Sequence, residues 1–145
     1  LDIIETLGDA YADTQKVKEN VKKTLCALLA VQDSSGFWYQ VIDKPKAEGN
    51  WRETSCTCLI ADAMAKAYRL GIMDGRAAES AKRAFEGVID SLQRDENGAP
   101  VLDGVCVGTC IDKGTYAHYI SRKTCAGDLH GSGAYLLMCA EMDRI

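Results

Sequence analysis

Two kinds of helix alternate along this chain, and the alternation limits its possible folds more than any other feature. Residues 53–70, ETSCTCLIADAMAKAYRL, are apolar or small on nearly every side of a helix. Residues 131–145 have the same character, and residues 1–13 read as the tail of another such helix. Residues 14–31 and 76–92, in contrast, are apolar on one face only. Because a helix that is apolar all round must be covered all round, we expect inner and outer helices in alternation.

The outer helices carry their apolar residues at helical spacing. These residues are Val17, Val21, Leu25, Leu28 and Leu29 in the first helix, and Ala77, Ala81, Ala84, Phe85, Val88, Ile89 and Leu92 in the second. Thr54 or Ser55 is placed to cap the inner helix between them, and Gly71 is placed to end it. Proline is nearly absent and strand patterns are short, so the sequence predicts an all-α fold.

The chain also repeats itself. LLAVQDSSGFWYQV and DSLQRDENGAPVLD share the end of a helix, a Gln, an Asp and a turn glycine, which is Gly36 or Gly98. GNWRETSCTCLIADAM and GDLHGSGAYLLMCAEM align without a gap. The repeating unit is therefore an outer helix, a turn, an extended or hairpin segment and an inner helix, roughly 60 to 80 residues in all. Chance similarity between helix ends is the alternative explanation.

An array of this kind closes naturally as an α/α toroid, with residues 1–145 as a single domain. If all inner helices run in the same direction, the long loops from outer to inner helices gather at one end of the array. We therefore expect Trp38, Glu53 and His130 to lie close together, at the N-termini of the inner helices. The macrodipoles of these helices make that end attractive to anions.

Composition and charge argue against several classes of partner. Apolar residues make up 47% and charged residues 26% of the chain, which is typical of a globular protein. A formal net charge of −4, with no cluster of Lys or Arg, argues against binding to nucleic acid. No apolar run approaches the roughly 18 residues of a membrane span, so we expect no membrane partner.

The seven cysteines are an odd number, and most of them fall inside apolar helical patterns. A thiol in such a position acts as a small hydrophobic group. Cys106 and Cys110 are the only pair that invites a zinc interpretation, but they lack a second pair at the spacing of a structural zinc site. We therefore expect seven reduced thiols, a cytoplasmic location, and no metal or other cofactor.

Four segments of the chain resemble one family of sugar-cleaving enzymes. They are SGFWYQVIDKPKAEGNWRETSCT, AKAYRLGI, GVCVGTCIDKGTYAHYISR and GDLHGSGAYLLMCAEM. From about residue 20 onward, the chain resembles the C-terminal half of glycoside hydrolase family 105, the unsaturated rhamnogalacturonyl hydrolases, which are related to the family 88 unsaturated glucuronyl hydrolases. The resemblance implies a partial (α/α)6 barrel with about five of its twelve helices, alternating inner and outer, and a short β-hairpin.

The resemblance also implies a chemistry. Such enzymes hydrate the vinyl ether of an unsaturated uronic acid at the end of an oligosaccharide, a product of pectin-degrading lyases. An Asp acts as general acid and base, without a metal. That Asp belongs to the first half of the family, so we expect no catalytic residue in this chain and an incomplete enzyme. Lys46 and Glu48 stand where some relatives carry Trp and Arg, a departure that bears on which sugar is bound.

The segment at residues 36–55 is rich in groups that can bind a sugar. Trp38 can stack on a sugar ring or pack in the core, and Gln40 can bond a hydroxyl group or face solvent. Trp51 and Arg52 precede an inner helix and can reach the mouth of the barrel. Arg52 suits a uronate carboxylate, although a salt bridge with a neighbouring glutamate is the alternative.

Two further candidates lie at the start of inner helices. Glu53 can orient a substrate or cap its helix, and the helix dipole favours its ionised form. His130 follows Asp128, a candidate N-cap, and precedes two glycines that let a ligand approach closely. The predicted substrate-binding residues are Trp38, Gln40, Trp51, Arg52, Glu53 and His130.

Three hypotheses about function compete. The first is the C-terminal half of a hydrolase acting on unsaturated uronides, and the second is a helical carbohydrate-binding or scaffold module without catalysis. The third is another toroid enzyme, such as a sugar epimerase or a terpenoid cyclase, which the lack of a His-rich centre or an Asp-rich metal motif disfavours. Because inner helices of a partial barrel lack neighbours, we also expect self-association or association with a missing N-terminal half.

Overall fold

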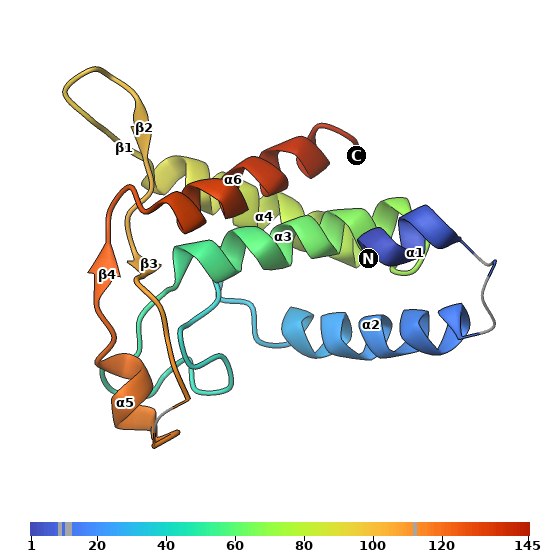
Figure 1. The fold of residues 1–145 in the computed structure, drawn as a ribbon, viewed down its shortest axis with the longest axis horizontal. Helices are drawn as coiled ribbons and strands as arrows, with labels where there is room; N and C mark the ends of the chain where they lie inside the picture. The colour runs from blue at the N-terminus through green and yellow to red at the C-terminus, as the bar shows by residue number, and fades with distance from the viewer. Residues whose placement is uncertain (9, 11–12, 112) are drawn as a thin grey trace.

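The computed structural model describes residues 1–8, 10, 13–111 and 113–145, and this part of the chain is mainly helical (Figure 1). Its helices are α1 (Asp2–Leu7), α2 (Thr14–Leu29), α3 (Thr54–Arg69), α4 (Gly75–Ser91), α5 (Tyr116–Ile120) and α6 (Leu129–Met142). Two small antiparallel sheets pair β1 (Gln93–Arg94) with β2 (Pro100–Val101), and β3 (Val105–Cys106) with β4 (Thr124–Cys125). The expected helical class and a short hairpin are confirmed, and α5 and the second sheet are additions to it.

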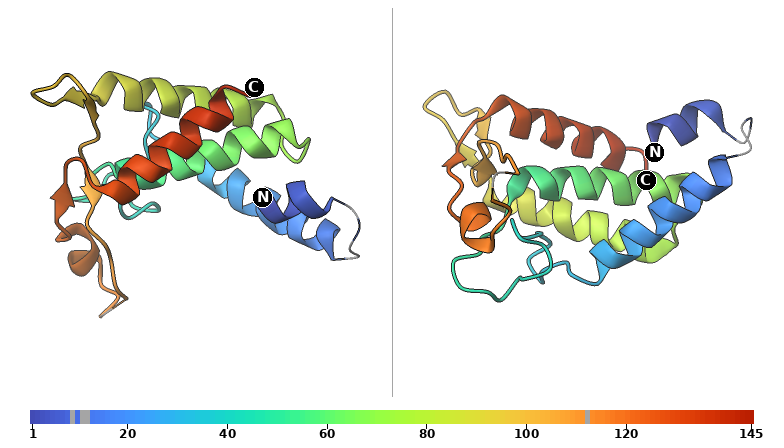
Figure 2. Two further views of the ribbon diagram at one scale, coloured as in Figure 1. Left: turned by 45° about the horizontal axis from the view of Figure 1, so that its top comes forward. Right: turned by 60° about the horizontal axis from the view of Figure 1, so that its bottom comes forward.

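Helix α3 is the centre of the array. Helices α2 and α6 lie on opposite sides of it, and α4 packs along it as well (Figures 1 and 2). Its buried residues cover most of its circumference: Thr54, Ser55, Thr57, Cys58, Ala61, Met64, Ala65, Lys66 and Ala67. The outer helix α4 buries one face only, through Ala77, Ser80, Ala81, Ala84 and Val88. The predicted distinction between inner and outer helices is therefore confirmed for these two helices.

Helices α3 and α6 run in the same direction. They meet at their N-terminal ends, where Ser55 lies beside His130, and at their C-terminal ends, where Arg69 pairs with Glu141. Asp2 of α1 pairs with Lys66 of α3, and Glu5, one turn later, pairs with Arg69, one turn later in α3. Helix α1 is therefore parallel to α3 and α6. Parallel inner helices are what the toroid model requires, and they bring the long loops to one end of the array.

The internal repeat is visible in the hydrogen bonds of its two turns. The Gly36 N–H donates to the Asp33 carbonyl oxygen (2.9 Å), and the Gly98 N–H donates to the Asp95 carbonyl oxygen (3.0 Å). Both glycines have a positive φ, of 89° and 79°. Gly36 is also confined by packing, because a Cβ there would lie 2.2 Å from the carbonyl oxygen of Arg83 in α4. The first turn is thereby fixed against the outer helix of the next unit.

Three further features of the described residues concern thiols, membrane-spanning helices and metal-binding groups. All seven cysteines belong to the described part of the chain, and all are free thiols. Within the same residues, no helix is long and apolar enough to cross a membrane. No group of three or more His, Cys, Asp or Glu side chains is arranged there to hold a metal ion.

Candidate functional site

Glu53 is the N-cap of α3, and it is almost completely buried, with 3% of its surface exposed. Its Oε2 accepts the backbone N–H of Cys56, and its Oε1 accepts the backbone N–H of Cys106 at 2.8 Å. The Ser55 hydroxyl donates to the same carboxylate, at 2.8 Å from Oε1 and 2.9 Å from Oε2. Hydrogen bonds and the helix dipole together compensate the burial of this charge.

The prediction that Thr54 or Ser55 caps α3 is wrong. The Thr54 hydroxyl donates instead to the carbonyl oxygen of Asp103 at 2.6 Å, and the Thr54 N–H donates to the carbonyl oxygen of Gly104 at 3.0 Å. These bonds dock the segment before β3 onto the start of α3. Gly104 permits the approach, because a Cβ at this residue would lie 2.9 Å from the Thr54 Oγ1. The docked segment carries the Cys106 N–H to the Glu53 carboxylate.

His130 extends this arrangement to α6. Its Nδ1 lies 3.3 Å from Oδ1 of Asp128, the N-cap of α6, and its Nε2 lies 3.4 Å from the Ser55 Oγ. Because Ser55 gives its only proton to Glu53, its oxygen is left to accept a bond from the imidazole. His130, Ser55 and Glu53 therefore form one hydrogen-bonded chain across the N-termini of two inner helices, and Asp128 lies beside the other ring nitrogen of His130.

The His130 side chain is 54% exposed, so it is the member of this chain that a ligand can reach. Trp38, Glu53 and His130 lie at one end of the helix array, as predicted: the Glu53 N–H donates to the Trp38 carbonyl oxygen at 2.9 Å, and His130 contacts Ser55. Sequence reasoning missed Ser55 as the link between Glu53 and His130. The only signal was its place two residues after a capping carboxylate.

Trp38 belongs to the core rather than to an open surface. None of its surface is exposed, and its indole N–H donates to the carbonyl oxygen of Leu28 at 2.9 Å. Its backbone N–H donates to the Thr57 Oγ1 at 3.1 Å. The interpretation of Trp38 as a stacking platform for a sugar therefore fails in this structure, because packing between α2 and α3 covers both faces of the ring.

The other loop candidates are held by neighbouring segments. Gln40 and Trp51 donate side-chain hydrogen bonds to carbonyl oxygens of α5, at 3.4 Å and 3.1 Å, and both are partly buried. Arg52 is half exposed and pairs with Asp33 at 3.0 Å, not with a neighbouring glutamate. A hydrogen bond from the Ser35 hydroxyl, helped by the Arg52 guanidinium, lowers the pKa of Asp33. Arg52 and His130 are thus the two predicted binding residues that are exposed, whereas Gln40 and Trp51 are only partly accessible.

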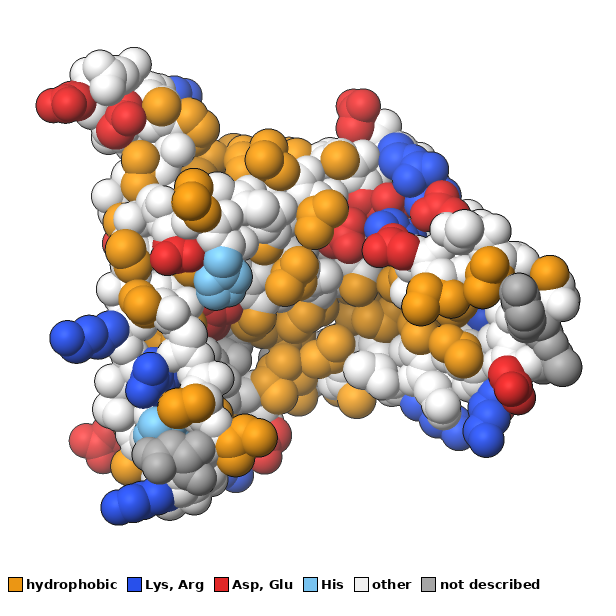
Figure 3. Space-filling model, viewed as in Figure 1, with side chains coloured by type: hydrophobic (Ala, Val, Ile, Leu, Met, Phe, Trp, Pro, Cys, Tyr) orange, Lys and Arg blue, Asp and Glu red, His pale blue; other side chains and the backbone are white. Residues whose placement is uncertain are grey.

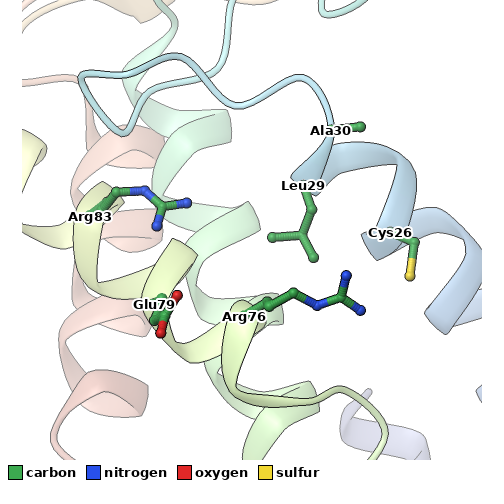
Figure 4. A pocket seen from close by; sticks show the side chains of 6 residues that line it. All are labelled: Cys26, Leu29, Ala30, Arg76, Glu79 and Arg83. Atoms are coloured by element: carbon green, nitrogen blue, oxygen red, sulfur yellow. The ribbon is translucent and has the colours of Figure 1, made fainter.

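A separate cavity of about 390 Å³ lies between the outer helices α2 and α4 (Figure 4). Two arginines border it together with Cys26, Leu29, Ala30 and Glu79. Both arginines have partners: Arg76 pairs with Asp74 at 2.9 Å, and Arg83 donates to the Gln32 Oε1 at 2.8 Å. Only the charge of Arg76 is neutralised by these bonds, because the partner of Arg83 is a neutral amide.

Comparison with known proteins gives a family and two curated relatives. The family model described as Glycosyl Hydrolase Family 88 matches residues 1–145. Protein Atu3128 of Agrobacterium fabrum and the 24.9 kDa protein in picA locus of Rhizobium radiobacter are each 29% identical over 154 residues, which covers 97% of this chain. The chain spans 65% of the length of each of these relatives.

Solved structures agree with the fold. A glycoside hydrolase from family 105 of C. acetobutylicum ATCC 824 matches with a TM-score of 0.91 and 30% identity, over 99% of this chain and 42% of that chain. A possible family 105 member from Klebsiella pneumoniae matches with a TM-score of 0.84 and 23% identity, over 99% and 36% of the two chains, a likeness that concerns the fold alone. This chain corresponds to the C-terminal part of these structures and forms part of an α/α barrel.

Proposed function

Because the chain belongs to glycosyl hydrolase family 88, we propose that it forms the substrate-binding part of a glycosidase for oligosaccharides that end in an unsaturated uronic acid. The reaction is the hydration of the vinyl ether in that sugar, after which the ring opens and the next sugar is released. The family match over residues 1–145 is the observation that carries this proposal.

The geometry at the start of α3 and α6 supports a role in binding a uronate. Two parallel helices begin side by side there, and their N-termini carry partial positive charge. His130 is the exposed end of the hydrogen-bonded chain through Ser55 to Glu53, and it is oriented by Asp128. A carboxylate that approaches His130 meets an imidazole whose orientation is already fixed.

Glu53 is poorly suited to be the catalytic acid. A general acid must carry a proton and reach the reacting atom. The Glu53 carboxylate accepts bonds from two backbone N–H groups and the Ser55 hydroxyl, and it is buried. These bonds already occupy both carboxylate oxygens, so neither is free to approach a substrate atom. The proposal therefore assigns substrate orientation to residues 1–145 and proton transfer to a carboxylic acid outside them.

A hybrid enzyme tests this assignment. Residues 1–145 would replace the matched part of the C. acetobutylicum family 105 hydrolase, which is 42% of that chain. With an unsaturated rhamnogalacturonan disaccharide, the hybrid should remove the ultraviolet absorbance of the double bond, whereas residues 1–145 alone should not. His130→Ala in the hybrid should raise KM roughly tenfold, the loss expected for a hydrogen bond to a charged group. Glu96→Ala, in the exposed turn of the β1–β2 hairpin, is the matched control.

Three results would argue against the assignment. Turnover by residues 1–145 alone, abolished by Glu53→Gln, would make Glu53 the catalytic acid. A folded hybrid that binds the disaccharide without turnover would favour the non-catalytic binding module. An unchanged KM in the His130→Ala hybrid would remove His130 from the binding site. Circular dichroism of each hybrid separates these results from a failure to fold.

A further inference from the structure

Helix α2 is a basic segment in an acidic chain. Its four lysines and one glutamate give it a formal charge of +3, whereas the whole chain has a formal charge of −4. Figure 3 shows Lys and Arg side chains at the lower right edge of the molecule, where α2 lies, and hydrophobic side chains over the middle of the same face. Charge of one sign that gathers on one element attracts partners of the opposite charge.

Three cavities follow one another along the side of α2 that faces α4 and the turn before it. Their volumes are about 390, 270 and 350 Å³. Cys26 and Arg76 border the first and the second cavity, and Lys22 and Gly71 border the second and the third. One wall is α2, and the other is formed by α4 and the turn between α3 and α4. Both walls consist of described residues, and we call the hollow between them the basic groove.

An amide holds Arg83 in place on the α4 wall. The Oε1 of Gln32 accepts from the Arg83 guanidinium and from the Ser80 hydroxyl, both at 2.8 Å. The Nε2 of Gln32 donates to the carbonyl oxygens of Gly36 and Ser80, at 2.9 Å and 3.0 Å. All four hydrogen bonds of the amide are thereby made, so it is fixed beside Arg83. Among the described residues no carboxylate pairs with Arg83, and its guanidinium borders the first cavity with its charge uncompensated (Figure 4).

The other charges of the basic groove are largely balanced. Hydrogen bonds from Arg76 lower the pKa of Asp74, and Lys22 adds to this effect from the α2 wall. Counted over the residues that line the three cavities, four cations face three carboxylates. One positive charge is therefore left over, and a carboxylate brought by a partner would balance it.

Apolar side chains lie between these charges. Leu29 stands between the two arginines in Figure 4, and Ile72 and Met73 continue the apolar lining into the second cavity. None of the described residues that line the three cavities is aromatic, so none offers a sugar ring a flat surface for stacking. Apolar side chains of a peptide suit this lining better. From Gln15 to Ala30 the groove follows α2 for about 22 Å, which accommodates about six or seven extended residues.

We propose that the basic groove is the docking site of an acidic, partly apolar peptide segment of a partner protein, bound in extended form with a carboxylate on Arg83. Because successive side chains of an extended segment point to opposite sides, acidic and apolar residues alternate along it. The apolar side chains pack on Leu29 and Ile72, and the carboxylates reach the cations at the rim. This interaction goes beyond the glycosidase function and does not depend on it.

A fluorescent heptapeptide tests the proposal. Glu and Leu alternate in it, with Glu at both ends. One control peptide carries Gln in place of Glu, and a second carries Ser in place of Leu. Fluorescence anisotropy measures the binding of each peptide to residues 1–145 at about 0.15 M salt. The Glu–Leu peptide should bind roughly tenfold or more tightly than either control, and its binding should weaken as the salt concentration rises.

Variants of the chain locate the binding. Arg83→Gln should weaken it roughly tenfold, the loss expected for a charge-assisted hydrogen bond. Lys22→Gln, which leaves the bonds of Gln32 intact, should weaken it by a smaller factor. Lys82→Gln is the matched control, because Lys82 is the exposed neighbour of Arg83 and borders a different cavity, between α4 and α6. It should leave the binding unchanged, and circular dichroism checks that each variant is folded.

Four results would overturn the proposal. Equal binding of the Gln control peptide would remove the role of charge, and equal binding of the Ser control peptide would remove the apolar contacts. Equal losses from Arg83→Gln and Lys82→Gln would mean attraction to the whole basic surface rather than a site in the groove. Displacement of the peptide by an equal concentration of tetragalacturonate would make the occupant an acidic sugar chain. His130→Ala should not affect the peptide, so a failure of the glycosidase assignment is recognised separately.

Discussion

At the scale of the residue, Glu53 joins two parts of the chain that are far apart in sequence, the start of α3 and β3. Its carboxylate accepts from the Ser55 hydroxyl and the Cys56 N–H in the first turn of α3, and from the Cys106 N–H of β3. The capping of α3 by Glu53 was one of the two roles that the sequence predicted for this residue, because a helix cap depends on neighbouring residues only. The bond from Cys106 was not predictable, because a backbone N–H leaves no trace in the residue type and its partner lies 53 positions away.

Glu53→Gln should destabilise the fold. The amide keeps one acceptor oxygen and places an NH2 group against backbone N–H donors, so at least one buried donor loses its partner. We expect a loss of about 1–3 kcal/mol in the free energy of unfolding, measured by urea denaturation. Glu48→Gln is the control, since Glu48 is an exposed glutamate in the same loop. An equal effect of the two substitutions would contradict the role of Glu53 as a buried acceptor.

At the scale of the element, the sequence located helices better than sheets. Helix α2 was expected at residues 14–31 and spans Thr14–Leu29, because apolar periodicity is a local signal. Gly71 ends α3 as predicted, with φ of 68° and its N–H bonded to the Tyr68 carbonyl oxygen. The β3–β4 pairing was not predicted, since its strands have two residues each and are joined across α5. Such pairings depend on tertiary contacts that no window of sequence contains.

Helix α1 is held to α3 and α6 by charges, and this attachment should depend on pH. Hydrogen bonds from Arg69, with a further one from Arg144, lower the pKa of Glu5 from 4.5 to about 2. A carboxyl group whose pKa is lower in the folded state stabilises the fold above its unfolded pKa. This contribution is lost as the pH falls from about 4.5 to 2. Burial raises the pKa of Asp62, which acts in the opposite direction.

Glu5→Gln isolates this contribution from the other carboxyl groups. The variant should melt at a lower Tm than the parent at pH 7, and the difference should shrink toward zero near pH 2. Thermal unfolding followed by circular dichroism at several pH values measures it. Glu96→Gln, in the exposed turn between β1 and β2, should show no such difference at any pH. A Tm difference for Glu5→Gln that is independent of pH would show that the ion pairs do not hold α1.

At the scale of the whole molecule, the alternation of helices determined the architecture, whereas the open faces could be located only in three dimensions. Helix α6 is apolar on all sides, yet Leu129, Leu136 and Leu137 are 87%, 66% and 51% exposed. Its buried residues, among them Ala134 and Met138, face the rest of the array. Sequence alone predicted that α6 needs cover all round. Which side stays uncovered depends on where α3 and α4 lie.

The exposed side of α6 should make the isolated chain self-associate. From Leu129 to Ala140 the helix carries no Asp, Glu, Lys or Arg, so two copies can meet along it without like-charge repulsion. We expect dimers or larger species by light scattering. Leu136→Glu combined with Leu137→Glu should shift them to monomer, because each copy would then present charge to the other. Ile111→Glu, at a residue 80% exposed outside α6, is the control and should leave the association unchanged. A monomer without dye binding to apolar surface would contradict this prediction, and it would mean that the chain covers the face of α6 by rearranging within itself.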